Sequence, residues 1–171
     1  MAKVAFIFDE MFEDSELEIP YERVKQAGHE PVLVGIEANK EVTGKRGKVV
    51  TTEVSVAEVR PEDFDGLIIP GGYSPDKIRT NEEMVELVRS VFEASKPVAA
   101  ICHAGWMLAE AGIVDGRTVT SYPSIKTDLV NAGARWVDQE VVEDGNLITS
   151  RWPDDLEAFS KAFLSQIEQR A

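Results

Sequence analysis

The 171-residue chain contains one cysteine, two histidines and no long apolar run. A single cysteine excludes a disulfide within the chain and fits a reducing compartment. No apolar stretch is long enough to cross a bilayer, and the N-terminus lacks the basic and apolar segments of a signal peptide. We therefore expect a cytoplasmic protein with no membrane partner.

Basic residues are also scarce, because 18 Lys and Arg face 31 Asp and Glu and give a net charge of −13. Docking on nucleic acid needs a basic face that neutralises phosphates, so this class of partner is excluded. The loop 9–14 is acidic and lacks the Ser, Thr and Gly that hold phosphate, which argues against a flavin or dinucleotide site. No set of His, Cys and carboxylate residues has metal-ligand spacing. We expect neither a cofactor nor a metal.

Short apolar segments alternate with amphipathic ones along the whole chain. Continuous apolar runs predict strands at 3–8, 31–36, 64–69 and 98–101, buried on both faces of a parallel sheet. The S-x-x-E pattern predicts a helix with Ser15 as its N-cap, and Asn81 is placed to cap another. Residues 48–56 alternate like an exposed ribbon, and 118–122 resemble a strand. The β-α-β alternation predicts the α/β class, with a doubly wound, mostly parallel sheet in one domain over 1–171.

Cys102 lies between a predicted strand and a predicted helix. Ala100 and Ala104 stand two residues to either side, and these small neighbours are typical of a nucleophile elbow. A thiol at a helix N-terminus is favoured as thiolate, so we expect its pKa to lie well below the roughly 8.5 of a free thiol. A buried structural cysteine is the alternative. The strand-turn-helix context favours the reactive thiol.

Three further side chains are candidate partners of this thiol. His103 is the nearby base, but adjacent helical residues do not face each other, so pairing requires a departure from helical geometry. Glu16 either serves the dipole of its helix or donates a hydrogen bond from a protonated carboxyl to the thiolate. Asp76 either caps a helical turn or orients His103 as the third member of a triad.

Backbone groups complete the candidate site. The N–H groups of Gly71, Gly72 and His103 are candidates for an oxyanion hole, although Gly-Gly also marks ordinary turns. The segments that carry these groups follow predicted strands, and active sites in open α/β sheets lie beyond the carboxyl ends of strands. The other histidine, His29, follows a helix stop and is expected at the surface.

The chain resembles the PfpI-type intracellular cysteine peptidases of the ThiJ/PfpI superfamily, which includes general stress proteins and deglycases. Six blocks carry the resemblance in order: FEDSELEIPY at 12–21, PGGYSPD at 70–76, AICHAG at 100–105, TSYPSIK at 120–126, NAGARWVD at 131–138 and SRWPDDL at 150–156. The resemblance implies a single PfpI-like domain with a flavodoxin-like fold of the class I glutamine-amidotransferase type. It also implies Cys102 as nucleophile, His103 as base and Glu16 as the buried acid beside the thiol.

The resemblance further implies a homodimer or higher homo-oligomer. In the peptidase members a Glu contributed across a subunit interface orients the His, and this chain has Asp76 at the matching place. True amidotransferases take a His from a distant downstream segment. This chain has none there, so we do not expect that reaction.

Two functions remain open from the sequence. The first is a stress-protective hydrolase in which the Cys102 thiolate attacks a carbonyl, either in a peptide or in the adduct that a dicarbonyl such as methylglyoxal leaves on amino groups of a glycated protein. The second is a non-catalytic, redox-responsive stress protein that senses oxidants through Cys102. The sequence does not choose between peptide and glycated-protein substrates.

Overall fold

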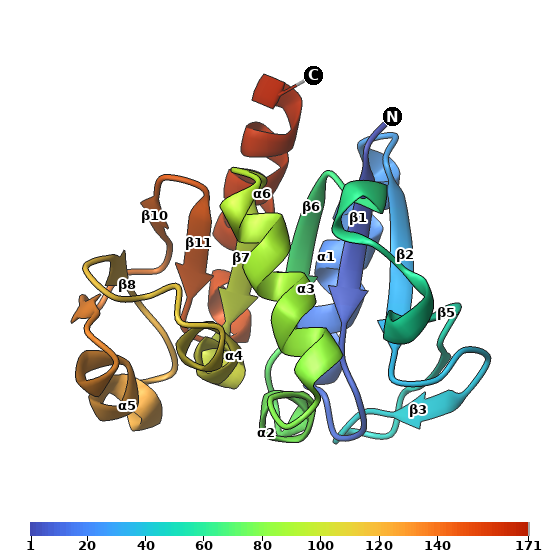
Figure 1. Ribbon diagram of the computed structural model, residues 1–171, viewed down its shortest axis with the longest axis horizontal. Coiled ribbons are helices and arrows are strands. Elements are labelled where there is room, and N and C mark those ends of the chain that lie inside the picture. The colour runs from blue at the N-terminus through green and yellow to red at the C-terminus, as the bar shows by residue number, and fades with distance from the viewer. Residues whose placement is uncertain (171) are drawn as a thin grey trace.

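A computed structural model describes residues 1–170. Its centre is a seven-stranded sheet in the order β10-β11-β7-β6-β1-β2-β5, in which only β10 runs antiparallel to its neighbour (Figure 1). In chain order the strands of this sheet are β1 (Lys3–Ile7), β2 (Glu30–Gly35), β5 (Val54–Ser55), β6 (Gly66–Ile69), β7 (Val98–Ile101), β10 (Val142–Asp144) and β11 (Leu147–Ser150). Two small pairs lie outside it: antiparallel β3 (Glu41–Thr43) with β4 (Val49–Thr51), and parallel β8 (Thr118–Val119) with β9 (Arg135–Trp136).

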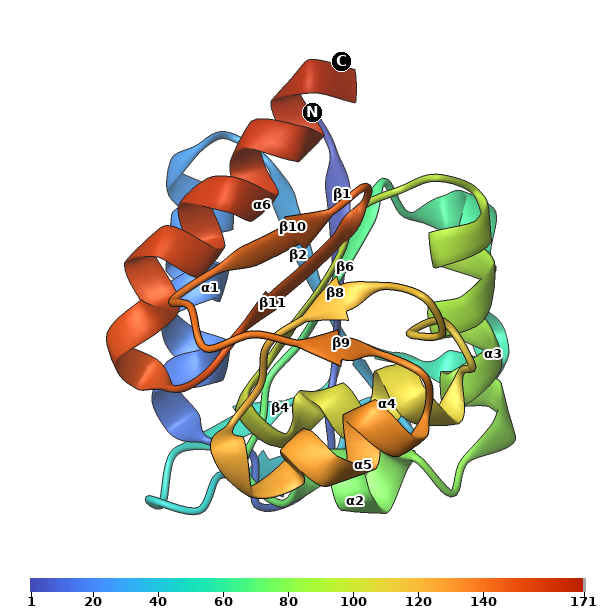
Figure 2. The same cartoon turned by 90° about the vertical axis from the view of Figure 1, so that its left-hand side faces the viewer.

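Helices cover both faces of the sheet, as the sequence predicts for a doubly wound fold. Figure 2 shows α1 and α6 on one side and α3 on the other, with the strands between them. The α-helices are α1 (Asp14–Gln26), α2 (Ser74–Ile78), α3 (Glu82–Glu93), α4 (Gly105–Glu110), α5 (Lys126–Asn131) and α6 (Leu156–Arg170). Short 3-10 helices are η1 (Val56–Glu58), η2 (Pro61–Asp63), η3 (Cys102–Ala104), η4 (Pro123–Ile125) and η5 (Pro153–Asp155).

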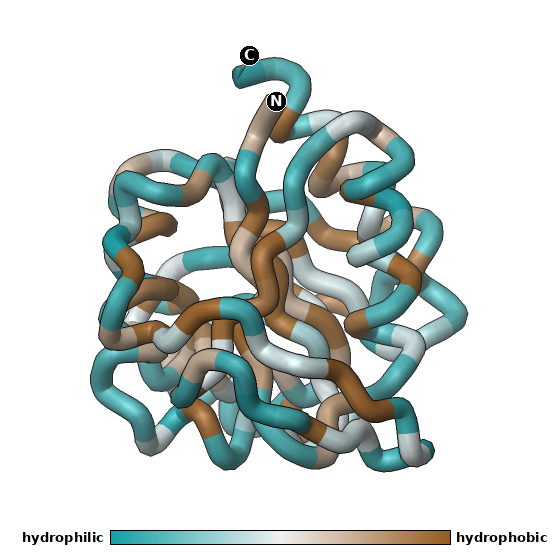
Figure 3. The backbone as a smooth tube through the Cα atoms, turned by 90° about the vertical axis from the view of Figure 1, so that its right-hand side faces the viewer, coloured by the Kyte–Doolittle hydropathy of each residue, from teal (hydrophilic) through white to brown (hydrophobic). Residues whose placement is uncertain are grey.

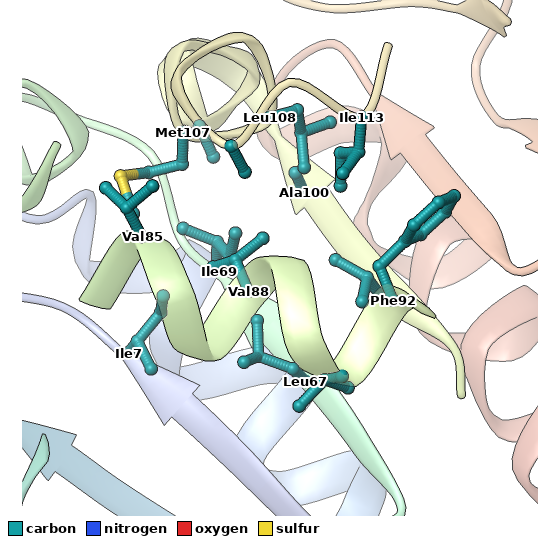
Figure 4. Packing of buried hydrophobic residues seen from close by; sticks show 14 of the residues in the cluster. Ile7, Leu67, Ile69, Val85, Val88, Phe92, Ala100, Met107, Leu108 and Ile113 are labelled. Atoms are coloured by element: carbon teal, nitrogen blue, oxygen red, sulfur yellow. The ribbon is translucent and has the colours of Figure 1, made fainter. Parts of the chain in front are cut away.

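Each face of the sheet has its own apolar core, which explains the continuous apolar runs. Successive strand residues point to opposite faces, so Ala5 and Ile7 join the α3 side while Val4 and Phe6 join the α1 and α6 side. Figure 4 shows the first core, where α3 and α4 pack on β6 and β7. Figure 3 shows the same pattern as hydrophobic segments along the central strands and hydrophilic segments on the outside. No helix within residues 1–170 is long and apolar enough to cross a membrane.

Three local predictions are wrong, each because a tertiary contact competes with the local pattern. Helix α1 begins at Asp14 with Glu13 as its N-cap, not with Ser15, because the Glu13 N–H bonds to the Gly71 carbonyl. Only Thr118–Val119 of the segment 118–122 is a strand, because the next N–H, of Thr120, is bound by the Thr149 hydroxyl. The ribbon at 48–56 divides, since β4 pairs with β3 while β5 joins the edge of the main sheet.

The parallel strands β1, β6 and β7 end at one edge of the sheet. Figure 1 shows α2, α4 and β3 gathered at this edge. The loop after β1 is tied to the turn after β6 by a β-bridge between Phe12 and Gly72 and by a Tyr73 N–H bond to the Met11 carbonyl. The loops that carry the candidate residues therefore meet at the position expected for an α/β active site.

Candidate active site

Cys102 occupies a strained elbow at the end of β7. Its φ angle is +64°, in the left-handed region that side chains other than glycine rarely adopt. The chain continues through η3 into α4, and the small neighbours Ala100 and Ala104 are both buried. Cys102 is nearly buried, with 9% of its surface exposed, and it lines a surface cleft. The nucleophile-elbow position predicted for Cys102 is confirmed in the fold.

His103 reaches the thiol because the elbow departs from helical geometry. Its Nδ1 atom lies 3.3 Å from Sγ of Cys102, and its Nε2 atom lies 3.0 Å from Oγ of Ser124. The Tyr122 ring stacks on the imidazole at 4.9 Å, and the Trp106 ring lies at 5.2 Å. Burial, with the nearby charge of Lys45, lowers the pKa of His103. A neutral imidazole follows at neutral pH, and such a ring can accept a proton.

Glu16 projects from the first turn of α1 and is fully buried. Its Oε1 accepts the Gly71 N–H at 2.8 Å, while Oε2 has no regular hydrogen-bond partner and the carboxyl interacts with the Cys102 thiol. Burial raises the pKa of Glu16 to about 8, and the negative charge of Glu13 adds to this effect. The carboxyl is therefore protonated at neutral pH and can donate toward sulfur.

The expected low pKa of Cys102 is not found. Burial raises the pKa of this thiol to about 12, helped by the charge of Glu16, while N–H groups of Gly72 and His103 act in the opposite direction. Burial therefore raises the pKa of the thiol by more than the N-terminus of the short helix can lower it. The two acids titrate as a pair, losing one proton near pH 8 and the other near pH 12. Between those values the pair holds a single negative charge, which the order of the two pKa values places mainly on the Glu16 carboxylate.

The Gly71-Gly72 turn allows this close packing. A Cβ atom on Gly71 would lie 2.6 Å from Oε1 of Glu16 and 2.7 Å from Cβ of Cys102. Gly72 has a φ of +80°, and its Cβ would lie 2.5 Å from the Glu13 nitrogen. Because Glu16 engages the Gly71 N–H, Gly71 is not free as an oxyanion donor, contrary to the prediction. The N–H groups of Gly72 and His103 remain, and both point to the sulfur.

Asp76 does not meet His103 within one chain. It is exposed on α2, its N–H donates to the Tyr73 carbonyl, and its carboxylate has no hydrogen bond or ion pair within residues 1–170. The imidazole of His103, which Asp76 was a candidate to orient, is instead in contact with Ser124. His29 also differs from its prediction, because it is half-buried and its Nδ1 accepts the Ala2 N–H.

A cleft of about 430 Å³ opens over the thiol, and sequence reasoning missed most of its walls. The turn between β3 and β4 brings Lys45 and Arg46 to the cleft, where both pair with the buried Glu13 carboxylate at 3.5 Å and 2.8 Å. Aromatic walls come from Tyr73, Tyr122 and Trp152. The basic T-G-K-R-G turn and the acidic 9–14 loop were the available signal. Within the part of the chain described, no cluster of three His, Cys or carboxylate residues could hold a metal.

The model of the DJ-1/PfpI family matches residues 2–166. The chain belongs to the DJ-1/PfpI family. A deglycase of Pyrococcus horikoshii is 45% identical over 166 residues, which cover 97% of this chain and 99% of that protein. YraA of Bacillus subtilis, named only as a proposed cysteine protease, is 42% identical over 97% of this chain and 98% of its own length.

Solved structures of DJ-1/PfpI proteins agree with the fold. A two-domain protein of Anabaena variabilis with DJ-1/ThiJ/PfpI-like and ferritin-like domains matches with a TM-score of 0.97 and 40% identity over 98% of this chain. The chain spans 48% of that protein. Drosophila melanogaster DJ-1beta matches with a TM-score of 0.90 and 31% identity over 97% of this chain and 90% of its own. The predicted PfpI-type family and the amidotransferase-like α/β fold are thus confirmed.

Proposed function

We propose that this protein is an intracellular cysteine-nucleophile hydrolase of the PfpI type, acting on dicarbonyl-glycated amino groups or on peptides. The observation that carries the proposal is the Cys102 elbow, where the backbone is strained and the thiol lies 3.3 Å from His103 and beside a buried, protonated Glu16. Full-length similarity to proteins named as deglycases supports the hydrolytic class.

The geometry supports a covalent route through the sulfur. Nδ1 of His103 takes the thiol proton as Sγ of Cys102 attacks the substrate carbonyl carbon, and the carbon–oxygen double bond becomes an oxyanion. The N–H groups of Gly72 and His103 stabilise that charge. For an amide, His103 then gives its proton to the departing amine, leaving a thioester that water cleaves with His103 as base. At neutral pH Glu16 keeps its proton and can donate a hydrogen bond to the charge that develops on sulfur.

Activity assays on the purified protein test this function. Methylglyoxal-treated amino acids and unfolded peptides are offered separately, and wild type is compared with Cys102→Ala. We expect release of free amine or of peptide fragments with wild type alone. Equal, background rates for wild type and Cys102→Ala on both substrates would exclude the hydrolase.

A second candidate is the redox-responsive stress protein, favoured by the accessible thiol beside an acid that can stabilise an oxidised sulfur. Intact-mass measurement after mild peroxide is expected to add oxygen atoms at Cys102 and none in Cys102→Ala. A protein that turns over substrate while Cys102 stays reduced would contradict this candidate.

We also propose that residues 1–171 act as one cytoplasmic PfpI-like domain that forms a homodimer or higher homo-oligomer. The family match over 2–166 supports a single domain. Exposed apolar side chains at the cleft rim support association, since Tyr73 is 57% exposed beside Met11, and Tyr122 is 39% exposed. A role for Asp76 in orienting His103 requires a second copy, because within one chain the two are not in contact. The net charge of −13 supports the absence of nucleic-acid and anionic-membrane partners.

A further inference from the structure

We propose that Ser124 is the positioning residue of His103. Its Oγ accepts a hydrogen bond from the Nε2–H of the imidazole, which leaves the Nδ1 lone pair facing the Cys102 sulfur. The catalytic consequence of this arrangement rests on the proposed hydrolase, whereas the choice of tautomer does not.

Ser124 and Cys102 contact opposite edges of one ring. Nε2 of His103 lies 3.0 Å from Oγ of Ser124, and Nδ1 lies 3.3 Å from Sγ of Cys102. A neutral imidazole carries one ring proton, so a hydrogen bond that fixes it at one nitrogen makes the other an acceptor. The Ser124 hydroxyl can accept a hydrogen bond from an Nε2–H group. The Cys102 thiol can pass its proton only to an unprotonated nitrogen, so Nδ1 has to be the acceptor. The arrangement with the proton at Nε2 satisfies both contacts.

The backbone holds the hydroxyl at this place. The Tyr122 N–H donates to the Cys102 carbonyl at 3.2 Å, and the Ile125 N–H donates to the Tyr122 carbonyl at 3.2 Å. Ile125 is buried, and Pro123 begins the 3-10 turn that contains Ser124. The same turn stacks the Tyr122 ring on the imidazole at 4.9 Å. Stacking fixes the plane of the ring, and the hydrogen bond at Ser124 fixes its rotation within that plane.

A hydroxyl differs from a carboxylate in what it does to the base. A carboxylate at Nε2 would stabilise the imidazolium and raise the pKa of His103. Ser124 adds no charge, and the pKa of His103 is lowered by burial and by Lys45. The ring therefore enters the reaction as a neutral base with Nδ1 free to take the thiol proton. Asp76, the carboxylate suggested by the resemblance, is exposed on α2 and makes no contact with the ring in one chain.

Nitrogen-15 NMR of protein labelled at histidine reads this tautomer directly. The chain has two histidines, and Nδ1 of His29 accepts the Ala2 N–H, so His29 must carry its proton at Nε2 and serves as an internal reference. We expect His103 to match His29 in the wild type. Ser124→Ala should turn His103 into a mixture of tautomers with His29 unchanged, and Ser124→Thr should restore the Nε2–H form.

The pH profile of activity supplies the second readout. Ser124→Ala should lower kcat by about tenfold with little change in KM, the effect of losing one hydrogen bond to the base. Ser124→Asp should move the His103 limb of the profile to higher pH, because it adds a negative charge at Nε2. Ser124→Thr should restore the wild-type profile.

The outcomes separate this inference from the proposed function. An unchanged His103 tautomer and an unshifted pH profile in Ser124→Ala would overturn the role of Ser124. A tautomer that responds to Asp76→Asn and not to Ser124→Ala would overturn it in favour of Asp76 of the partner subunit. Absence of turnover in the wild type would reject the hydrolase while the tautomer measurement still decides the role of Ser124.

Discussion

Glu16 is a buried carboxyl whose placement costs free energy of folding. The carboxyl is fully buried and has lost its hydration, but one of its two oxygens lacks a regular hydrogen-bond partner. Its contacts in the folded protein therefore replace only part of the lost hydration. Its pKa of about 8 means that the folded state holds a proton which the unfolded state, with a pKa of 4.5, has already released. Folding therefore becomes less favourable as pH rises between these two values.

Replacing Glu16 by Gln should stabilise the protein at neutral pH. The free energy of unfolding of wild type should fall by up to about 1.4 kcal/mol per pH unit between the unfolded and folded pKa values of Glu16, a loss that Glu16→Gln avoids. The two proteins should differ little at pH 4 and most near pH 8. Urea melts across this range measure the difference, and parallel curves with a constant offset would contradict the raised pKa.

The same substitution should change the reactivity of the thiol. In wild type Glu16 loses its proton near pH 8 and the thiol near pH 12, so the rate of alkylation by iodoacetamide, which follows the thiolate, should stay low until well above pH 8. In Glu16→Gln the rise should move to lower pH, because the repelling carboxylate is gone while an amide donor persists. Alkylation followed by mass spectrometry gives both profiles, and superimposable curves would show that Glu16 and Cys102 are not coupled.

At the scale of elements, the turn after β6 and the turn between β3 and β4 shape the cleft. The first turn places Gly72 beside the sulfur, with a positive φ that favours glycine. The second turn brings Lys45 and Arg46 to the cleft over the thiol. Neither turn belongs to the main sheet. The reactivity of the elbow consequently depends on two connections that can be altered one at a time.

Gly72→Ala should damage the site far more than Gly47→Ala. Both glycines have positive φ, +80° and +99°, but a Cβ on Gly72 would meet backbone atoms of the loop before α1 at 2.5 Å, whereas Gly47 has open space. We expect a loss of about 1 kcal/mol of stability in Gly47→Ala from the backbone conformation alone. Gly72→Ala should lose about 3 kcal/mol or more, together with Cys102 reactivity. Urea melts and alkylation rates of both variants check this, and equal losses would refute the packing argument.

Asp14 should hold the β3–β4 turn in place. Its carboxylate accepts the N–H of Arg46 at 3.1 Å and of Lys48 at 2.9 Å. Asp14→Ala should therefore speed hydrogen exchange at these two amides by about tenfold or more, since each loses a charge-assisted bond. Glu18→Ala is the matched control, because Glu18 reaches the same turn only through an exposed pair with Lys48 at 3.6 Å. Exchange that is equally slow in both variants would argue against this anchor.

The sequence predicted the elements whose signal is local. Apolar runs revealed the buried strands, and Ala100, Cys102 and Ala104 revealed the elbow, because strand burial and elbow crowding act on neighbouring residues. Contacts between distant segments left no such trace. The bond from Ser124 to His103 spans 21 residues, and the bond from Gly71 to Glu16 spans 55, so neither spacing nor periodicity could indicate them.

For the whole molecule, a net charge of −13 opposes the proposed self-association. Copies of the chain repel one another at long range, and salt screens that repulsion without weakening an apolar interface of the kind that exposed Tyr73 and Met11 could form. We expect the oligomer to tighten as sodium chloride is added, and Tyr73→Glu to weaken it. Sedimentation velocity at low and moderate salt measures both effects. Association that weakens with salt would instead indicate an interface held by opposite charges.

The walls of the cleft come from the full span of the chain, from Glu13 to Pro153. During synthesis the segment with Cys102 leaves the ribosome well before the residues around Tyr122 and Trp152. A nascent or truncated chain therefore holds a flexible, ordinary thiol without its base-positioning turn. Completion of folding brings the base and the cleft walls to Cys102 while burial raises the pKa of its thiol. In misfolded or shortened copies the thiol should therefore be more ionised at neutral pH, but it should lack the site that directs it to a substrate.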